Sequence, residues 1–175
     1  MTKPVLLGMN NPISTDPRRA LYPAPAGCTG HRIFEMLAAS RARRSASPLL
    51  RHEYLDAFDR LNLVEGQQWS SAAAKERAEW VRRTYAGRTI VVFGAETWHA
   101  LKLVETEWLG RAHSPGLQFQ PFPHEYGSLS QVASEVTRVN STWWRFPHPS
   151  GLNRWYNDEA NYRAASDLLC RIGGL

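Results

Sequence analysis

The sequence predicts an α/β fold, a three-layer sandwich in which helices flank a central, mostly parallel sheet. Segments with the composition of short buried strands alternate with segments of helical periodicity, a pattern typical of parallel sheets covered on both faces. The clearest strand, Arg88–Gly94, has no polar residue after Thr89, as expected for a central strand. A length of 175 residues fits one domain over residues 1–175.

In the N-terminal half, the residue patterns of four segments indicate their secondary structure. Pro4–Gly8 predicts a short buried strand that ends in a glycine turn. Residues 10–30 are dense in Pro, Gly, Ser, Thr and Ala and predict a long loop, which in a compact domain is often functional. Residues 31–41 predict a helix because their apolar side chains share one face. Residues 51–64 mix helical spacing with a possible strand and stay ambiguous.

Helices and short strands also alternate through the rest of the chain. Residues 71–86 predict a helix, and Gly87 stands where a left-handed cap would end it. A further helix is expected over residues 95–109, after the strand Arg88–Gly94. The remaining predicted elements are an edge strand over 117–122, a helix over 128–139 that opens on a capping-box pattern, a strand over 143–147 and a closing helix over 158–172.

The charge of the chain points to a class of partner. There are 21 Lys and Arg residues against 16 Asp and Glu, a net charge of +5, and only Lys3, Lys75 and Lys102 are lysines. Guanidinium groups grip phosphates and stack on rings, so that an arginine-rich basic chain is typical of nucleic-acid binders. The codon usage of a GC-rich genome produces the same bias, so composition leaves both explanations open.

The sequence argues against several other classes of protein. No apolar run approaches the about 20 residues that a membrane span needs, and the N-terminal apolar run is too short for a signal peptide. We therefore expect no membrane partner, a monomer, and the cytoplasm as the default location. Cys28 and Cys170 suggest neither a disulfide scaffold nor an iron–sulfur site. We expect no cofactor and no metal, since no ligand spacing joins His52, His99, His113 and His124.

Two polar loops follow predicted strands near the two ends of the chain. Residues 8–12, Gly-Met-Asn-Asn-Pro, follow the first strand, and residues 148–154, His-Pro-Ser-Gly-Leu-Asn-Arg, follow the last. In parallel sheets ligands bind at the carboxyl ends of the strands, where both loops are expected. Each loop alone is also ordinary turn chemistry, but the pair in this order is far more specific.

The pair of loops resembles the uracil-DNA glycosylase superfamily, most closely its mismatch-specific uracil/thymine branch. That branch carries Gly-x-Asn-Pro after the first strand and Asn-Pro-Ser-Gly-Leu, a polar residue and Arg near the end. His148 replaces the first asparagine of the second motif, as in other branches. The helix start His31–Phe34 and the strand Val91–Gly94 also resemble family segments. The resemblance implies an α/β domain that acts on DNA.

The first motif departs from the family by one residue. Asn10 and Asn11 both precede Pro12, where the family has a single asparagine. Counted from Gly8, Asn10 matches the asparagine that positions the attacking water; counted from Pro12, Asn11 does. We favour Asn10, because the strand and its glycine fix the frame.

The resemblance implies roles for the remaining residues of the two loops. Leu152 stands at the place of the wedge that fills the stack when a base is flipped out. His148 would donate a hydrogen bond to the pyrimidine O2. Met9 and Tyr22 would contact the base, although Tyr22 is also explained as loop packing. The residues expected to contact DNA around the wedge are Ser150, Gly151, Asn153 and Arg154, of which Arg154 is also explained as a surface cation.

Three functions remain open from the sequence. The first is a DNA glycosylase of DNA repair that flips uracil or a modified or damaged pyrimidine out of duplex DNA and hydrolyses its N-glycosidic bond. The second is a DNA modification enzyme, a transferase that modifies the flipped pyrimidine without excision, which agrees with the inserted asparagine. The third is a catalytically silent module that binds flipped bases.

Overall fold

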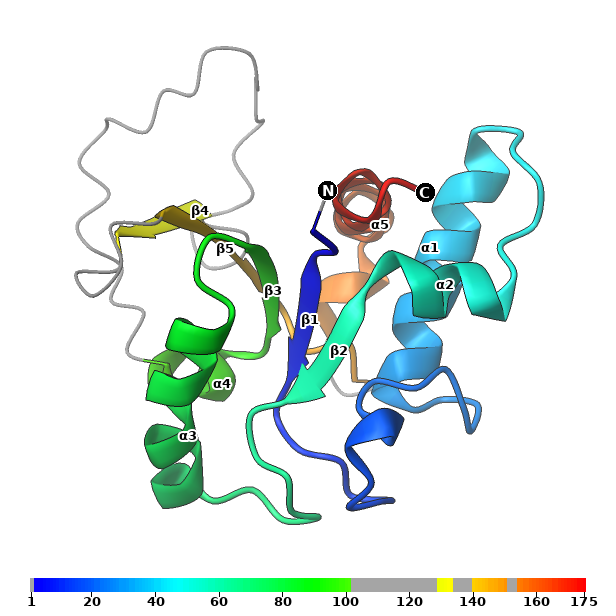
Figure 1. Ribbon diagram of the computed structural model, residues 1–175. Coiled ribbons are helices and arrows are strands. Elements are labelled where there is room, and N and C mark those ends of the chain that lie inside the picture. Colours follow the sequence, from blue (N-terminus) through cyan, green and yellow to red (C-terminus); the bar gives the residue numbers. More distant parts are fainter. Residues whose placement is uncertain (1, 102–128, 134–139, 151–153) are drawn as a thin grey trace.

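The computed structural model describes residues 2–101, 129–133, 140–150 and 154–175 (Figure 1). A five-stranded sheet has the order β2-β1-β3-β5-β4; its first four strands pair in parallel, and β4 is antiparallel to β5. This confirms the predicted α/β fold with a mostly parallel sheet. The strands are β1 (Val5–Gly8), β2 (Asp59–Asn62), β3 (Thr89–Phe93), β4 (Leu129–Ala133) and β5 (Asn140–Phe146).

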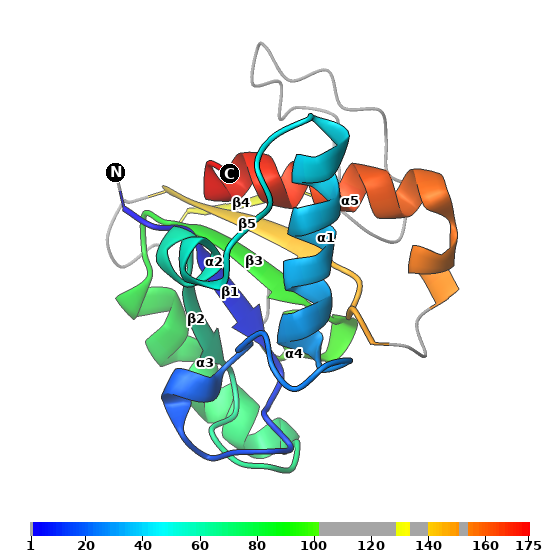
Figure 2. The ribbon, with the colours of Figure 1, turned by 90° about the vertical axis from the view of Figure 1, so that its right-hand side faces the viewer.

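Helices cover both faces of the sheet (Figures 1 and 2). One hydrophobic core lies between the sheet and α1 (Thr29–Arg43), α2 (Arg51–Ala57) and α5 (Glu159–Gly173). The other lies between the sheet and α3 (Ser71–Thr84) and α4 (Ala95–Ala100). Alternate residues of β1 and β3 belong to the two cores, so both strands are buried on both faces. None of the helices that the structure describes has the length and apolar character needed to cross a bilayer.

The ambiguous segment 51–64 contains two elements of different type. Its first half forms α2, and its second half forms β2, an edge strand of the sheet. Tyr54 and Phe58 pack into the core beneath α1, whereas Leu61 and Leu63 pack into the core beneath α3. The mixed apolar pattern therefore arose because one short segment supplies side chains to both faces of the sheet.

The predicted helix over residues 128–139 is wrong over residues 129–133, and the rest of that range lies outside the described residues. Leu129–Ala133 form β4, which pairs antiparallel with β5. Hydrogen bonds to β5 outweigh the local capping pattern, since propensity is a weak guide where a sheet edge offers a partner. The predicted edge strand over 117–122 and the part of the predicted helix beyond residue 101 lie outside the described residues.

The loop that follows β1 contains more structure than predicted. A short 3₁₀ helix, η1 (Pro17–Arg19), interrupts it, and α1 begins at Thr29, two residues earlier than expected. The Cys28 side chain caps α1, because its Sγ accepts a 3.4 Å hydrogen bond from the His31 amide. A second 3₁₀ helix, η2 (Arg154–Asn157), precedes α5.

A buried hydroxyl anchors this loop to the core. The Tyr54 side chain is 0% exposed, and its hydroxyl donates a 2.7 Å hydrogen bond to the Leu21 carbonyl oxygen. Burial raises the pKa of Tyr54, so the hydroxyl stays a proton donor at all ordinary pH values. Arg60 donates a 3.0 Å hydrogen bond to the neighbouring carbonyl of Ala20. Both hydrogen bonds connect the loop to residues of α2 and β2.

We expect Tyr54→Phe to lower the free energy of unfolding by about 1–3 kcal/mol, because it leaves a buried carbonyl without its donor. Urea-induced unfolding of the wild type and the variant measures the difference. Tyr85→Phe, which removes a hydroxyl from a partly buried tyrosine after α3, is the control and should change the stability by less than about 0.5 kcal/mol. Equal losses in the two variants would contradict the anchoring role.

Candidate functional site

The two loops identified in the sequence lie at the same edge of the sheet. The carboxyl ends of β1, β3 and β5 lead into Met9, Gly94 and His148. A Cβ atom placed on Gly94 would lie 3.5 Å from His148 Cβ, 3.7 Å from His148 Cδ2 and 3.8 Å from Met9 Sδ. The fold therefore brings one residue of each loop against the end of the central strand.

Gly94 has a backbone conformation that this arrangement requires. Its φ of 93° is one that side chains disfavour, and its amide donates a 2.9 Å hydrogen bond to the Phe146 carbonyl. This bond continues the pairing of β3 and β5 to their last residues. Gly94 thus ends β3 next to the His148 side chain, and α4 begins at the following residue.

His148 is partly buried, and this desolvation lowers the pKa of its imidazole. The ring is therefore mainly neutral at pH 7, a form in which one ring nitrogen carries a hydrogen and the other is an acceptor. The backbone around it is held by hydrogen bonds. The Ser150 amide donates to the His148 carbonyl at 2.8 Å, and the Tyr156 hydroxyl donates to the Pro147 carbonyl at 2.8 Å.

The two asparagines of the first loop make different contacts. The Asn10 side-chain nitrogen donates a 2.6 Å hydrogen bond to the carbonyl of Gln67, in the loop after β2. Its amide oxygen accepts no hydrogen bond from any residue that the structure describes. Both ends of the Asn11 amide are engaged within its own loop, because the nitrogen donates to the Arg19 carbonyl at 3.2 Å and the oxygen accepts from the Ile13 amide at 3.0 Å. Asn11 therefore shapes the loop.

The other predicted site residues lie in the loop after β1, in the segment after β5 and in η2. Tyr22 is partly buried and its ring lies 5.3 Å from the Arg19 guanidinium carbon, a cation–π contact within the first loop. Ser150 is partly buried beside His148, and Arg154 is exposed at the start of η2. The predicted wedge Leu152 and its neighbours Gly151 and Asn153 lie outside the described residues.

Asn62 is a candidate site residue that the sequence reasoning missed. It is the last residue of β2 and is 9% exposed, and its Oδ1 has no hydrogen-bond partner among the described residues. A Cβ atom on Gly8 would lie 2.6 Å from this oxygen, so a side chain there would displace the Asn62 amide. A buried amide with an unpaired end is costly and is therefore of functional interest. An asparagine at the end of a strand could have identified this residue from the sequence. It was missed because residues 51–64 did not clearly predict a strand.

The site contains neutral hydrogen-bonding groups of complementary kinds. The Asn10 amide oxygen accepts no hydrogen bond from the described residues, and the imidazole of His148 is neutral. Within the described parts of the chain, no three His, Cys, Asp or Glu side chains lie close enough to hold a metal ion. Such a set of groups is suited to recognising the polar edge of an uncharged ring and to orienting a water molecule.

Comparisons with known proteins add no family to this description. No protein-family model and no curated protein matches the chain. The functional argument therefore depends on the geometry of the site and on the sequence of its two loops.

We expect the stability of the protein to fall as the pH is lowered from about 7 to 5, in part because of His148. Its pKa in the folded state lies below the ordinary value of 6.5, so the unfolded chain binds a proton more readily in this range. Urea unfolding at a series of pH values should show a shallower fall for His148→Gln. Identical pH dependence in the two proteins would contradict a buried neutral imidazole.

Proposed function

We propose that this protein is a DNA glycosylase that flips a pyrimidine, uracil or a modified base, out of duplex DNA and hydrolyses its N-glycosidic bond. The observation that carries the proposal is the meeting of Met9 and His148 at Gly94. These residues come from the two loops whose sequences resemble the uracil-DNA glycosylase superfamily. Loops that are about 140 residues apart in the sequence thus contribute to one place.

The protonation state of His148 supports its proposed role. Breaking the bond between the sugar C1′ and the base nitrogen leaves the electron pair, and hence negative charge, on the base. A neutral imidazole N–H directed at the pyrimidine O2 stabilises this charge as it develops. The low pKa of His148 keeps the ring in this form at neutral pH.

The contacts of the two asparagines support Asn10 as the residue that positions water. Its amide nitrogen is fixed by Gln67, and its oxygen is left to accept a hydrogen bond from a water molecule. That water attacks C1′ and loses a proton to solvent as the base departs. Because an amide is not a base, we expect hydrolysis to be slow compared with an enzyme that uses an aspartate. Both ends of the Asn11 amide are already committed to the loop.

The charge of the protein supports DNA as the partner. Five more cations than anions are carried by 175 residues, and most cations are arginines, which bind phosphates in a bidentate way. Arg18 and Arg154 are exposed on segments that adjoin the two loops. Arg18 forms an ion pair with Asp16 at 3.0 Å.

The proposal is tested with a duplex that carries one uracil opposite guanine. Alkali-labile abasic sites should form with the wild type, and single-turnover rates should fall by about 100-fold or more in Asn10→Ala and in His148→Ala. Gln68→Ala, an amide truncation in the same region, is the control and should keep the wild-type rate. Absence of cleavage above the Asn10→Ala background would refute hydrolysis. Altered nucleosides in DNA from cells that express the protein would then indicate base modification. Binding to DNA without any product would indicate a silent binding module.

The predicted wedge gives a separate test. Leu152→Ala should lower activity on duplex DNA and leave activity on single-stranded substrate unchanged, because only the duplex has a stack to refill. Arg154→Ala should weaken binding to both forms and reduce the salt slope by about one unit. Thermal melting checks the fold of both variants. A drop of several degrees for Leu152→Ala, with equal effects on both substrates, would identify Leu152 as a core residue.

A further inference from the structure

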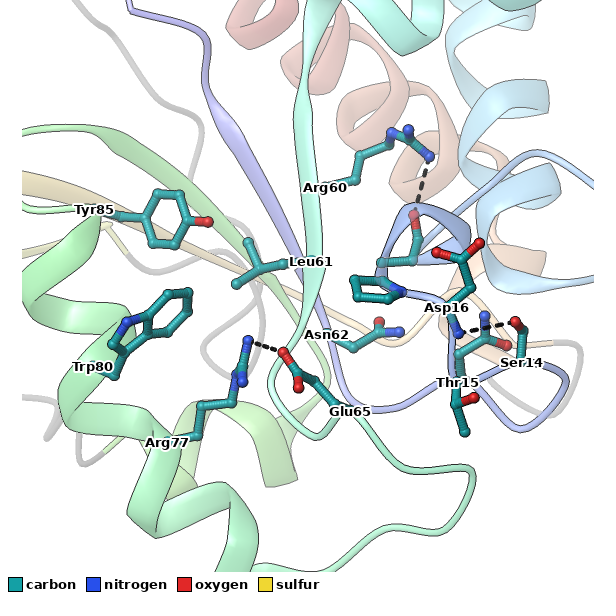
Figure 3. A pocket seen from close by; sticks show the side chains of 13 residues that line it. Ser14, Thr15, Asp16, Arg60, Leu61, Asn62, Glu65, Arg77, Trp80 and Tyr85 are labelled. Carbon is teal, nitrogen blue, oxygen red and sulfur yellow. Dashed lines mark hydrogen bonds and ion pairs between the residues drawn. The ribbon is translucent and has the colours of Figure 1, made fainter.

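A cavity of about 210 Å³ lies at the outer edge of β2, apart from the contact of Met9 with His148 at Gly94 (Figure 3). One wall is formed by the segment from Asn11 to Ala20, and the other by α3 and the turn after it. The floor is β2. The volume is below the about 300–1,000 Å³ of pockets for drug-sized ligands, so it fits a single small molecule or ring. The lining residues that matter here are Asp16, Arg60, Asn62, Arg77, Trp80 and Tyr85.

The α3 wall is an aromatic platform. Trp80 is 46% exposed, which makes it one of the few large apolar side chains exposed in the described structure. The Tyr85 ring meets it edge-on, with centroids 6.0 Å apart and planes at 86°. The Arg77 guanidinium carbon lies 4.5 Å from the Trp80 ring centroid. An exposed indole held by a cation and a second ring is the kind of surface on which planar rings stack.

Three buried polar atoms on residues of this cavity lack a hydrogen-bond partner among the described residues. They are the Nε atoms of Arg60 and Arg77, which are donors, and Oδ1 of Asn62, an acceptor. Buried groups of this kind are costly to leave unpaired. The Arg77 donor lies on the Trp80 side of β2, and the Arg60 donor and the Asn62 acceptor lie on the side of Tyr54, so the lining contains both kinds of hydrogen-bonding group.

The charges around the cavity favour a neutral ligand. Arg77 forms an ion pair with Glu65, and Asp16 forms one with Arg18 at 3.0 Å. The hydrogen bonds from Arg18 lower the pKa of Asp16, so this carboxylate stays ionised at neutral pH. Among the lining residues, the carboxylates of Asp16 and Glu65 balance the guanidinium groups of Arg60 and Arg77, which leaves little net attraction for a phosphate group.

We propose that the edge of β2 carries a second ring-binding site, which takes a nucleobase by stacking it beside Trp80 and hydrogen-bonding its polar edge. The site goes beyond the proposed glycosylase activity, because neither Met9 nor His148 lines the cavity. The same chemistry is offered by a free nucleoside and by an unpaired base of a strand.

The experiment measures binding of uridine, cytidine, adenosine and guanosine by ligand-observed NMR, with inorganic phosphate as a further probe. At least one nucleoside should bind, and phosphate should neither bind nor compete. Trp80→Ala and Arg77→Ala should each weaken binding at least about fivefold, as expected for the loss of a stacking partner. Trp80→Phe, which keeps an aromatic face, should retain part of the affinity.

Arg83→Ala is the matched control. Arg83 lies on α3 with its own acidic partner, Glu79, and is not a lining residue, so this variant should bind as the wild type does. Tetranucleotides of each base distinguish the two sources: tighter binding than the nucleoside indicates a strand, and equal binding indicates a free nucleoside.

The inference would be overturned if no nucleoside or tetranucleotide bound, if Trp80→Ala and Arg83→Ala caused equal losses, or if phosphate competed. His148→Ala separates this site from the proposed active site. It should lower glycosylase activity by about 100-fold or more and leave nucleoside binding intact. A loss of nucleoside binding would instead place the bound ring at the carboxyl edge of the sheet and refute the second site.

Discussion

The burial of β1 and β3 on both faces is the constraint on which the rest of the structure depends. Val5, Leu6 and Leu7 are 0% exposed, as is every residue of β3 after Thr89. Apart from Thr89, these strands have no polar side chain that could face water, so helices must cover both sides of the sheet. Parallel pairing then sends the loops that follow β1, β3 and β5 to a single edge. The candidate site is a consequence of this topology.

The loop after β1 depends on a second set of contacts, which come from elements later in the chain. Leu21 has a φ of 46°, an unfavourable conformation for a leucine. The buried Tyr54 hydroxyl holds its carbonyl, and Gly30 allows close approach, because a Cβ there would lie 2.3 Å from the carbonyl oxygens of Leu21 and Tyr22. The core thus determines the path of the loop that contains Asn10 and Asn11.

Asn62 connects the two sites discussed above. It stands at the end of β2, against Gly8 on one side and within the cavity beside Trp80 on the other. Because β2 is an edge strand, its outer side has no neighbouring strand to fill the space next to it. The cavity occupies this space beside the outer strand β2. Asn62, the last residue of the same strand, also lies near the carboxyl ends of the strands.

The sequence by itself determined the elements that local patterns specify. The unbroken apolar run of β3, the helical spacing of α3 and the closing helix α5 are specified locally, and each was predicted close to its observed bounds. The two loops were also found from the sequence, because turn residues after an apolar strand are a local signal. Their position at one edge followed from the parallel topology.

Only the tertiary structure decided the features that depend on distant partners. Residues 51–64 divide into α2 and β2 because they supply two different cores, and residues 129–133 form a strand because β5 offers its edge. The partners of the Asn10 and Asn11 amides, and the burial of Asn62, likewise depend on the folding of separate segments. A hydrogen bond between residues 57 positions apart, as between Asn10 and Gln67, leaves no periodicity in the sequence, so only the folded chain reveals it.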